Sequence, residues 1–375
     1  MDLEFTSDQE ELRSSVRAVL ARECPPSLVR EVVEKGTQAD DLWAAMVELD
    51  WPALTVDPAC GGLGLGFVEL AVVVEELGRV MAPGPFLPTV SQFVPAVREA
   101  GTPEQRERFL GDVAAGRITG TIAVAEEPGS WAGEDVGLEA RPDAGGWLLH
   151  GTKRYVADGA TADELVVAAR LQGTAGPDGL VLFVVPQDAV DATVLQTLDA
   201  SRQYATVVLD GVRVGRDRTL GEPGRGAAPL TRALEEAWTA LALEMVGTCQ
   251  SIFDIALDHA KTREQFGVPI GSFQAMKHKF ADMYVALESA RALCYFASAT
   301  IAEDDERRSL AASMAKAAAG DCQRLIAQDG IQSLGGIGFT WEHDMHLYVK
   351  RAKSGDAVFG TARHHRARIA AFAGV

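Results

Sequence analysis

The chain has 375 residues, of which 47% are hydrophobic and 23% are charged. This composition predicts a globular protein with a large core in two or three domains, and it excludes an intrinsically disordered chain. The formal net charge of −18 disfavours nucleic acid and anionic membranes as partners. An anionic ligand would need local positive contacts, so isolated arginines become informative.

The cysteines indicate a reducing compartment. They are odd in number and scattered along the chain without CxxC spacing, at Cys24, Cys60, Cys249, Cys294 and Cys322. Such usage is typical of reduced thiols, and nothing around these residues suggests an activated thiolate. The N-terminus has no apolar signal core, and no apolar run reads as long enough to span a bilayer. We therefore expect a cytoplasmic protein.

Hydrophobic periodicity predicts helices over the first third of the chain. The segment from Ser7 to Glu10 resembles a helix entry, with a polar cap and an acidic residue in the first turn. Further helices are expected at residues 40–49, 67–81 and 103–115, with a glycine-rich loop at 60–66. We assign residues 1–119 to an N-terminal helical domain.

The pattern changes near Gly120. Short apolar runs separated by turn residues follow at fairly even intervals, at 121–125, 146–151, 164–169, 179–185 and 205–209. They predict a middle domain at residues 120–224 that forms a small β-barrel or sandwich. Residues 225–375 are helical again, and their long antiparallel helices predict a bundle. The fold class is therefore α+β, with several domains.

The glycine-rich loop does not fit a dinucleotide-binding fingerprint. After Gly62 and Gly64, the third glycine of that fingerprint would fall at Phe67. The acidic residue expected about 20 residues later would follow a helix rather than a second strand. We interpret the segment as a plain loop before a helix, which argues against a Rossmann-type NAD enzyme.

A more specific signal lies between Lys261 and Gln274. The fixed positive charge of Arg263 is followed by the rings of Phe266 and Phe273, by glycines and by the Gln274 amide. Arginine donates paired hydrogen bonds to phosphate oxygens, while flat rings and an amide can hold adenine. The segment predicts a site for the diphosphate and adenine of a dinucleotide.

Three glycines close the long helix that begins near Arg308, in the segment Gln332–Phe339. A helix C-cap would need only one glycine. Three of them allow a ligand to approach the backbone closely. Both interpretations stay open from this segment alone, and pairing it with Arg263 favours a cofactor.

Histidine pairs near the C-terminus have plainer interpretations. His343 and His346 are three residues apart, a spacing that would suit a metal ion on one helical face. No third ligand is evident, so we predict no metal. His364 and His365, which lie between two arginines, are interpreted as a solvated basic helix start.

Together these segments resemble the acyl-CoA dehydrogenase family of flavoenzymes over essentially the whole chain. The residues that carry the resemblance are Thr262–Gly267 with Phe273 and Gln274, Gln332–Phe339, and more weakly Glu127–Gly129 and Gly61–Gly66. The segment Gly336–Asp344 looks like the actinobacterial branch, which includes subunits of heteromeric steroid side-chain dehydrogenases.

The resemblance implies an N-terminal helical domain, a β-barrel middle domain and a C-terminal four-helix bundle. Flavin adenine dinucleotide (FAD) would lie between the middle domain and the bundle, with the neighbouring subunit supplying the arginine-phenylalanine segment and the glutamine-glycine turn. A dimer would then be the minimum unit. The positions that match FAD contacts are Arg263, Gln265, Phe266, Phe273, Gln274, Gln332, Gly335 and Gly336.

The chemistry implied by the resemblance is α,β-dehydrogenation of an acyl-CoA thioester to the trans-2-enoyl-CoA. A carboxylate removes the α-proton and the β-hydride passes to the flavin. Such a base works best when apolar enclosure raises its pKa. The implied partners are the acyl-CoA substrate, an electron-transfer flavoprotein or similar acceptor, and further subunits of a homo- or hetero-oligomer, either a dimer or a tetramer.

The chain departs from the family at the catalytic base. In most members this is the glutamate of a Tyr-Glu-Gly-Thr turn, and counting from Ala352 without gaps places Phe359 there. Other members carry the base on the first bundle helix, at the position of Ala237 here. The neighbouring Glu236 is our candidate base, although one helical residue is a rotation of about 100° and the helix would have to shift.

Other carboxylates near these positions have weaker claims. Glu235 and Glu236 could instead form a solvated helix face. Asp356, three residues before the Phe359 position, is a weaker candidate base. Glu244 is interpreted as structural.

The flavin pocket of the middle domain also departs from the family. The usual tryptophan-isoleucine-threonine strand is Tyr155-Val156-Ala157, and Ala157 cannot supply a hydroxyl to the flavin. The usual threonine before Glu-Pro-Gly is Glu126, and an acid beside the flavin would be unusual. Backbone groups could still hold the ring.

Two roles therefore stay open. The chain could be an active dehydrogenase with an unusual base, or a non-catalytic subunit that completes the FAD site of a catalytic paralogue. A flavin-free structural protein of the same fold is less well supported, because the phosphate-binding arginine would then have no use.

Overall fold

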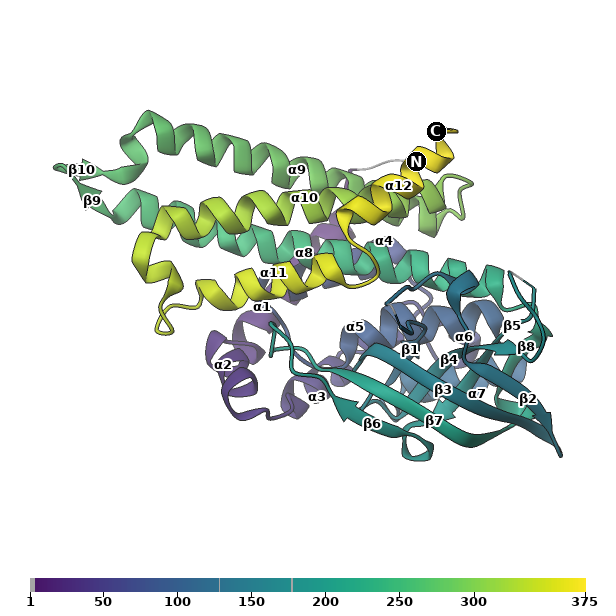
Figure 1. Ribbon diagram of the computed structural model, residues 1–375. Coiled ribbons are helices and arrows are strands. Elements are labelled where there is room, and N and C mark those ends of the chain that lie inside the picture. Colours follow the sequence, from purple (N-terminus) through teal and green to yellow (C-terminus); the bar gives the residue numbers. More distant parts are fainter. Residues whose placement is uncertain (1–3, 128, 177) are drawn as a thin grey trace. The chain divides into compact units, whose positions relative to one another are not determined.

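The computed structural model describes residues 4–127, 129–176 and 178–375 (Figure 1). Helices occupy the chain up to Ala114, strands begin at Gly120 and end at Gly224, and helices return at Ala227. By internal contacts the chain forms two compact units. The first comprises residues up to Thr37, Phe67–Pro83 and Trp238–Val375, and the second comprises Gln38–Gly66 and Gly84–Ala237. The three-domain division stays a prediction.

The first unit is a bundle of helices. Its elements are α1 (Ser7–Glu23), α2 (Pro26–Lys35), α4 (Phe67–Arg79), α8 (Ala227–Thr262) from Trp238 on, the short strands β9 (Glu264–Gln265) and β10 (Val268–Pro269), the 3-10 turn η7 (Ile270–Ser272), α9 (Gln274–Ala302), α10 (Arg308–Leu334), the 3-10 turn η8 (Gly335–Phe339), α11 (Met345–Ala357) and α12 (Ala362–Phe372). The C-terminal helices α8 to α12 make up most of it, and α1, α2 and α4 from the N-terminal part of the chain pack with them.

Side-chain caps explain where several of these helices begin. The α1 helix starts with a capping box, in which the Thr6 hydroxyl accepts from the Gln9 N–H and the Gln9 amide accepts from the Thr6 N–H. At α12, the Thr361 hydroxyl accepts from the His364 N–H. These bonds satisfy backbone donors that a helix start otherwise leaves unpaired.

The α8 helix is long and apolar enough to cross a membrane by length and composition, which the sequence reading had excluded. However, 72% of its most apolar window is buried within the protein. Such burial is typical of the core helix of a globular protein, in which neighbouring helices take the place of lipid.

Glycines let α4 and α8 meet at their backbones. A Cβ atom on Gly247 would lie 2.0 Å from the Glu75 carbonyl oxygen, and one on Gly78 would lie 2.2 Å from the Glu244 carbonyl oxygen. Larger residues at either position would force the helices apart. Beside this contact the Glu75 carboxylate accepts from Arg291 at 2.8 Å and from the Tyr295 hydroxyl at 2.6 Å. The buried charge is therefore paired, as burial requires.

The second unit contains one mixed sheet and short helices. Its helical elements are α3 (Asp40–Glu48), η1 (Trp51–Ala53), η2 (Pro58–Cys60), α5 (Phe86–Pro88), the π-helical η3 (Thr89–Phe93), α6 (Val94–Ala100), α7 (Pro103–Ala114), η4 (Gly133–Asp135), η5 (Gln187–Ala189) and η6 (Arg216–Arg218), together with the beginning of α8. Its strands are β1 (Gly120–Ala123), β2 (Glu139–Asp143), β3 (Gly146–Ala157), β4 (Glu164–Leu171), β5 (Leu180–Pro186), β6 (Asp191–Val194), β7 (Tyr204–Gly215) and β8 (Thr219–Gly224).

Within the described residues the sheet order is β6-β7-β3-β2-β4-β5-β8, with β1 pairing beside β4. Both β1 and β2 run parallel to β4, and the other pairs are antiparallel. The long β3–β7 pair has register shifts after Leu149 and Lys153. Such irregularities bend a sheet locally and redirect its side chains.

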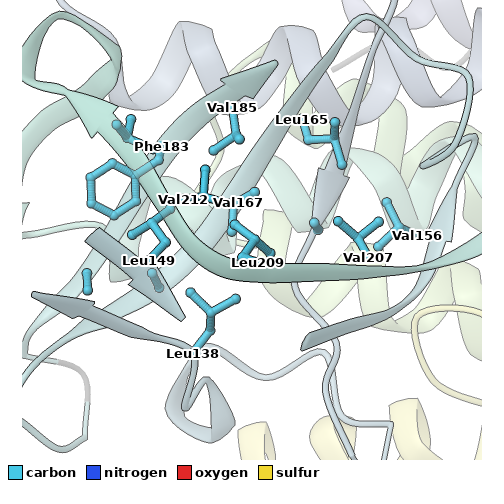
Figure 2. Close-up of a cluster of buried hydrophobic side chains, with 14 of the residues drawn as sticks. Leu138, Leu149, Val156, Leu165, Val167, Phe183, Val185, Val207, Leu209 and Val212 are labelled. Atoms are coloured by element: carbon cyan, nitrogen blue, oxygen red, sulfur yellow. The ribbon is translucent and has the colours of Figure 1, made fainter. Parts of the chain in front are cut away.

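The core of this unit lies on one face of the sheet (Figure 2). Alternate residues of β4, such as Leu165 and Val167, meet alternate residues of β5, such as Phe183 and Val185. The intervening residues of both strands are buried too, so these strands are covered on both faces, as their continuous apolar runs suggest. Each fully buried Leu or Phe contributes about 1.5–3 kcal/mol to stability.

Candidate functional site

The segment predicted to bind a dinucleotide forms a hairpin at one end of the bundle, between α8 and α9 (Figure 1). Its tip is a two-residue turn with positive φ at both positions, 56° at Phe266 and 80° at Gly267. Glycine adopts this conformation freely, whereas phenylalanine does so at a cost of about 1–3 kcal/mol. Phe266 is nevertheless 94% exposed. The hairpin therefore tolerates a strained backbone at a residue whose aromatic ring is exposed to solvent.

Arg263 is positioned by the last turn of α8 and by the hairpin. Its N–H donates to the His259 carbonyl and its own carbonyl accepts from the Ile270 N–H, both at 2.8 Å. The guanidinium is exposed, and within the described part of the chain it forms no ion pair or side-chain hydrogen bond. Its donors are therefore available to an anion.

The first glycine after α10 caps the helix, and the next one leaves the backbone uncovered. Gly335 caps the helix at φ 66° and ψ −142°, a conformation that only glycine adopts readily. A Cβ atom on the next residue, Gly336, would meet no atom within 4 Å. The backbone at this turn is therefore open to approach. The α9 helix runs antiparallel to both α8 and α10, so α8 and α10 end on the same side of the bundle. The turn after α10 and the hairpin after α8 therefore lie at one end, as Figure 1 shows.

The position of the family's catalytic glutamate is a tightly held turn. Phe359 is 5% exposed and has φ 58°. The buried Lys316 ammonium donates to the Asp356 carbonyl at 3.1 Å and to the Gly360 carbonyl at 2.9 Å. His365 Nε2 lies 3.0 Å from the Phe359 carbonyl. Because a carbonyl only accepts, Nε2 carries the proton.

His365 corrects one sequence interpretation. It is fully buried rather than part of a solvated basic helix start. Burial, followed by the nearby Lys316 charge, lowers the pKa of His365 to about 3. Burial likewise lowers the pKa of Lys316 to about 8, against the opposing effect of the Asp356 carboxylate. The imidazole also packs edge-on against Trp238, with ring centroids 5.1 Å apart.

Glu235 and Glu236 correct another interpretation, because neither forms a solvated helix face. Both are buried near the start of α8, and the Glu236 carboxylate pairs with Arg98 of α6. Burial alone would lower the pKa of Arg98, but the Glu236 and Glu99 carboxylates outweigh it and raise that pKa. The candidate base is thus held in an ion pair.

The remaining carboxylates near the base positions are also engaged. Asp356 Oδ1 accepts from the Ala362 N–H at 3.1 Å and so helps to close the turn. Glu244 forms a buried pair with Arg351 at 2.8 Å, in agreement with its expected structural role. Removing one partner of such a pair leaves an uncompensated charge, which costs about 3–5 kcal/mol.

Glu126, in the loop after β1, is bonded to groups of its own unit. Its carboxylate accepts from the Gly137 and Leu138 N–H groups and from the buried Lys153 ammonium at 2.6 Å. Burial lowers the pKa of Lys153 to about 8, and the Glu126 charge opposes that shift. Ala157 is buried and has no polar side-chain atom. In the Glu127–Gly129 motif, Pro128 lies outside the described residues.

The histidine pair lies at the start of α11, with His343 just before the helix and His346 within it. His343 Nδ1 accepts from the Met345 N–H at 3.0 Å, and the His346 ring stacks on Trp341 with centroids 4.7 Å apart. Throughout the described ranges, no group of three or more metal-ligating side chains occurs. The glycine-rich loop is bonded to the end of η1, where the Leu63 and Leu65 N–H groups donate to the Ala53 and Leu54 carbonyls.

Sequence reasoning missed the charged side chains that hold these positions, namely the partly exposed Arg98 and the buried Lys153 and Lys316. A lysine or arginine in a helix or strand normally signals a solvated face. The partners of these three lie 138, 27 and 40 or more residues away in the sequence. Local pattern therefore carried no signal for them.

Comparisons with known proteins agree with this geometry. Residues 6–117 match the acyl-CoA dehydrogenase N-terminal domain and residues 224–374 match the C-terminal domain. The chain belongs to the acyl-CoA dehydrogenase family. Members are FAD-dependent oxidoreductases, so FAD is its cofactor. Acyl-CoA dehydrogenase IpdE2 of Mycolicibacterium smegmatis is 30% identical, covering 98% of this chain and 99% of the relative.

Two solved structures are similar over nearly the whole acyl-CoA dehydrogenase fold. A Tcur3481–Tcur3483 steroid ACAD variant is 30% identical, with a TM-score of 0.87 and coverage of 98% of both chains. The ChsE4–ChsE5 complex from Mycobacterium tuberculosis is 25% identical, with a TM-score of 0.90 and coverage of 100% of this chain and 99% of that one. The predicted fold class and family are thereby confirmed.

The residues of this chain fit one half of an FAD molecule better than the other. The unpaired Arg263 guanidinium, the exposed Phe266 ring and the open Gly336 backbone suit the diphosphate and adenosine. At the flavin-ring positions, Glu126 is paired with Lys153 and Ala157 has no hydroxyl. The chain's own ring contacts therefore do not fit the family pattern.

Proposed function

We propose that this chain is a subunit of a heteromeric, cytoplasmic acyl-CoA dehydrogenase and that it completes the FAD site of a catalytic paralogue. The observation that carries the proposal is the buried Phe359 at the base position, in a turn held by Lys316 and His365. A phenyl ring cannot accept the α-proton of an acyl-CoA thioester.

The alternative carboxylates support the same role. Glu236 is paired with Arg98, and Asp356 is bonded to the Ala362 N–H. A general base needs to reach its substrate proton within about 2.6–3.2 Å. Each carboxylate is instead fixed by a partner from its own unit.

In this proposal the chain contributes binding rather than proton transfer. Arg263 would hold the diphosphate of FAD, and the Phe266 ring and the Gln332–Gly336 turn would hold its adenosine. Bound FAD supplies the hydride acceptor for α,β-dehydrogenation. The paralogue then provides the carboxylate base and the flavin-ring contacts that this chain lacks, and an electron-transfer flavoprotein or similar acceptor reoxidises the assembly.

Co-expression with a paralogue tests this role. We expect the chain alone to hold little FAD and show little turnover with acyl-CoA, and the co-purified assembly to hold FAD and turn over. Full activity of the chain by itself would overturn the proposal. In the assembly, Arg263→Ala should lower the FAD-to-protein ratio, whereas Arg216→Ala, at an exposed arginine of the second unit, should leave it unchanged.

A second candidate is an active homo-oligomer with Glu236 as a displaced base. It is favoured by the burial of Glu236 one residue from the Ala237 position. In that case Glu236→Gln should abolish turnover while leaving FAD content unchanged. Retained turnover in the variant would remove this candidate.

A further inference from the structure

A histidine lies one helical turn before the arginine of the hairpin. His259 and Arg263 are four residues apart, and the Arg263 N–H donates to the His259 carbonyl at 2.8 Å, which continues the helical pattern. Side chains at this spacing share one helix face and are neighbours. The Arg263 charge lowers the pKa of His259, so the guanidinium and the imidazole lie within electrostatic range of each other.

The electrostatic surroundings of His259 are positive. Burial lowers the pKa of His259, and the charges of Arg263 and His343 lower it further. The free chain therefore keeps this imidazole mostly neutral near neutral pH. Other titratable groups at this end of the bundle are Asp258, Lys261 and Glu264 on the α8 side, Lys277 and His278 on α9, and Glu342 before α11.

The acidic members of this set are Asp258, Glu264 and Glu342. Asp258 and Lys261 lie 3.8 Å from each other and are both largely exposed. His343 Nδ1 already accepts from the Met345 N–H, so only Nε2 of that ring can take a new partner. An incoming dianion would meet the fixed charge of Arg263 and the imidazole of His259, which can take up a proton.

We propose that His259 is part of the diphosphate site and that FAD binding takes up a proton there. This inference rests on the proposed role of Arg263. The doubly anionic diphosphate offsets the Arg263 charge, so a proton from solvent moves onto the neutral imidazole. The imidazolium then adds a second positive charge beside the phosphates, where charge-assisted hydrogen bonds are the stronger kind.

The first experiment measures the linkage on the flavin-containing assembly. Release of FAD, followed by the fluorescence of the free flavin, gives the affinity between about pH 6 and pH 8. We expect FAD to bind roughly threefold to tenfold more tightly at the lower pH, because one unit of pKa shift corresponds to a tenfold coupling. Calorimetry in two buffers of different ionisation enthalpy should show proton uptake on FAD binding. No proton uptake in the unsubstituted assembly would overturn the inference.

Matched variants assign the proton to one residue. His259→Asn should bind FAD with little pH dependence, whereas His278→Asn, at an exposed histidine of α9, should retain the full dependence. An unchanged pH slope in His259→Asn would overturn the inference, and His259→Gln serves the same comparison if the first variant fails to fold. If Arg263→Ala left FAD binding intact, the proposed function itself would fail. If Arg263→Ala lost FAD but the unsubstituted assembly bound FAD independently of pH, the role of His259 would be rejected and that of Arg263 kept.

Discussion

Two phenylalanines of this chain share a backbone conformation and differ in everything around it. Phe266 at the hairpin tip and Phe359 at the base position have φ values of 56° and 58°, and each is followed by a glycine. The first ring is 94% exposed and the second 5%. The same strained backbone conformation therefore accompanies an exposed ring at Phe266 and a buried ring at Phe359.

The difference lies in the polar groups around each turn. The hairpin tip is held by its two short strands, which pair Val268 with Gln265 and Pro269 with Glu264, and by an edge-on contact of the Phe266 ring with Phe273. The Phe359 turn is held by Lys316 and His365 from two different helices. Strained conformations persist only where the surroundings over-determine them. The Phe359 turn is held in this way by groups of the chain itself. We expect the Phe266 turn to be held by contacts with the rest of the assembly.

The largest expected effect is at the inner ring. Phe359→Gly should lower the free energy of unfolding by about 3 kcal/mol, because the lost burial of the ring outweighs the relief of backbone strain. Urea denaturation of purified chain measures it. A variant as stable as the parent would show that the ring contributes no packing.

Next is the lysine beneath the same turn. Lys316→Ala should cost about 2–3 kcal/mol, because it leaves the Asp356 and Gly360 carbonyls without their donor and opens a cavity. The matched control is Lys261→Ala at an exposed lysine of α8, which should change stability by less than about 0.5 kcal/mol. Equal effects of the two substitutions would contradict a role of Lys316 in holding the Phe359 turn.

The histidine of the turn makes stability depend on pH. The pKa of His365 is about 3 in the folded chain and about 6.5 when unfolded. Between these values the unfolded state binds the extra proton, so stability falls as the pH drops through that range. From pH 7 to pH 5 this residue should account for a loss of about 2 kcal/mol. His365→Gln should flatten the unfolding profile in this window, and a profile as steep as the parent's would contradict the assignment.

The smallest effect is expected at the outer ring. Phe266→Gly should leave the chain as stable as before or stabilise it by about 0.5–1 kcal/mol, because glycine adopts positive φ without strain. The same variant should weaken FAD retention in the assembly, measured by the FAD-to-protein ratio. Destabilisation of the isolated chain would show that the ring packs within it, which would blur the contrast with Phe359.

Short segments of the sequence were sufficient to predict the family and the order of helical and strand-rich segments, both of which are confirmed, whereas the roles of the segments around Arg263 and Gln332 stay predictions. Periodicity and turn residues report structure within a few residues of themselves. The resemblance also places Phe359 at the base position and Ala157 where a hydroxyl is usual, by counting along short motifs, and both assignments stay predictions.

Only the tertiary structure decided what surrounds those positions. It paired Glu236 with Arg98 and Glu126 with Lys153, and it buried His365 where a solvated face was expected. Each partner comes from a distant part of the chain, so its effect on charge and burial is absent from any local window. Buried ion pairs are properties of the packed fold, because a charge tolerates burial only where another element brings its counter-charge.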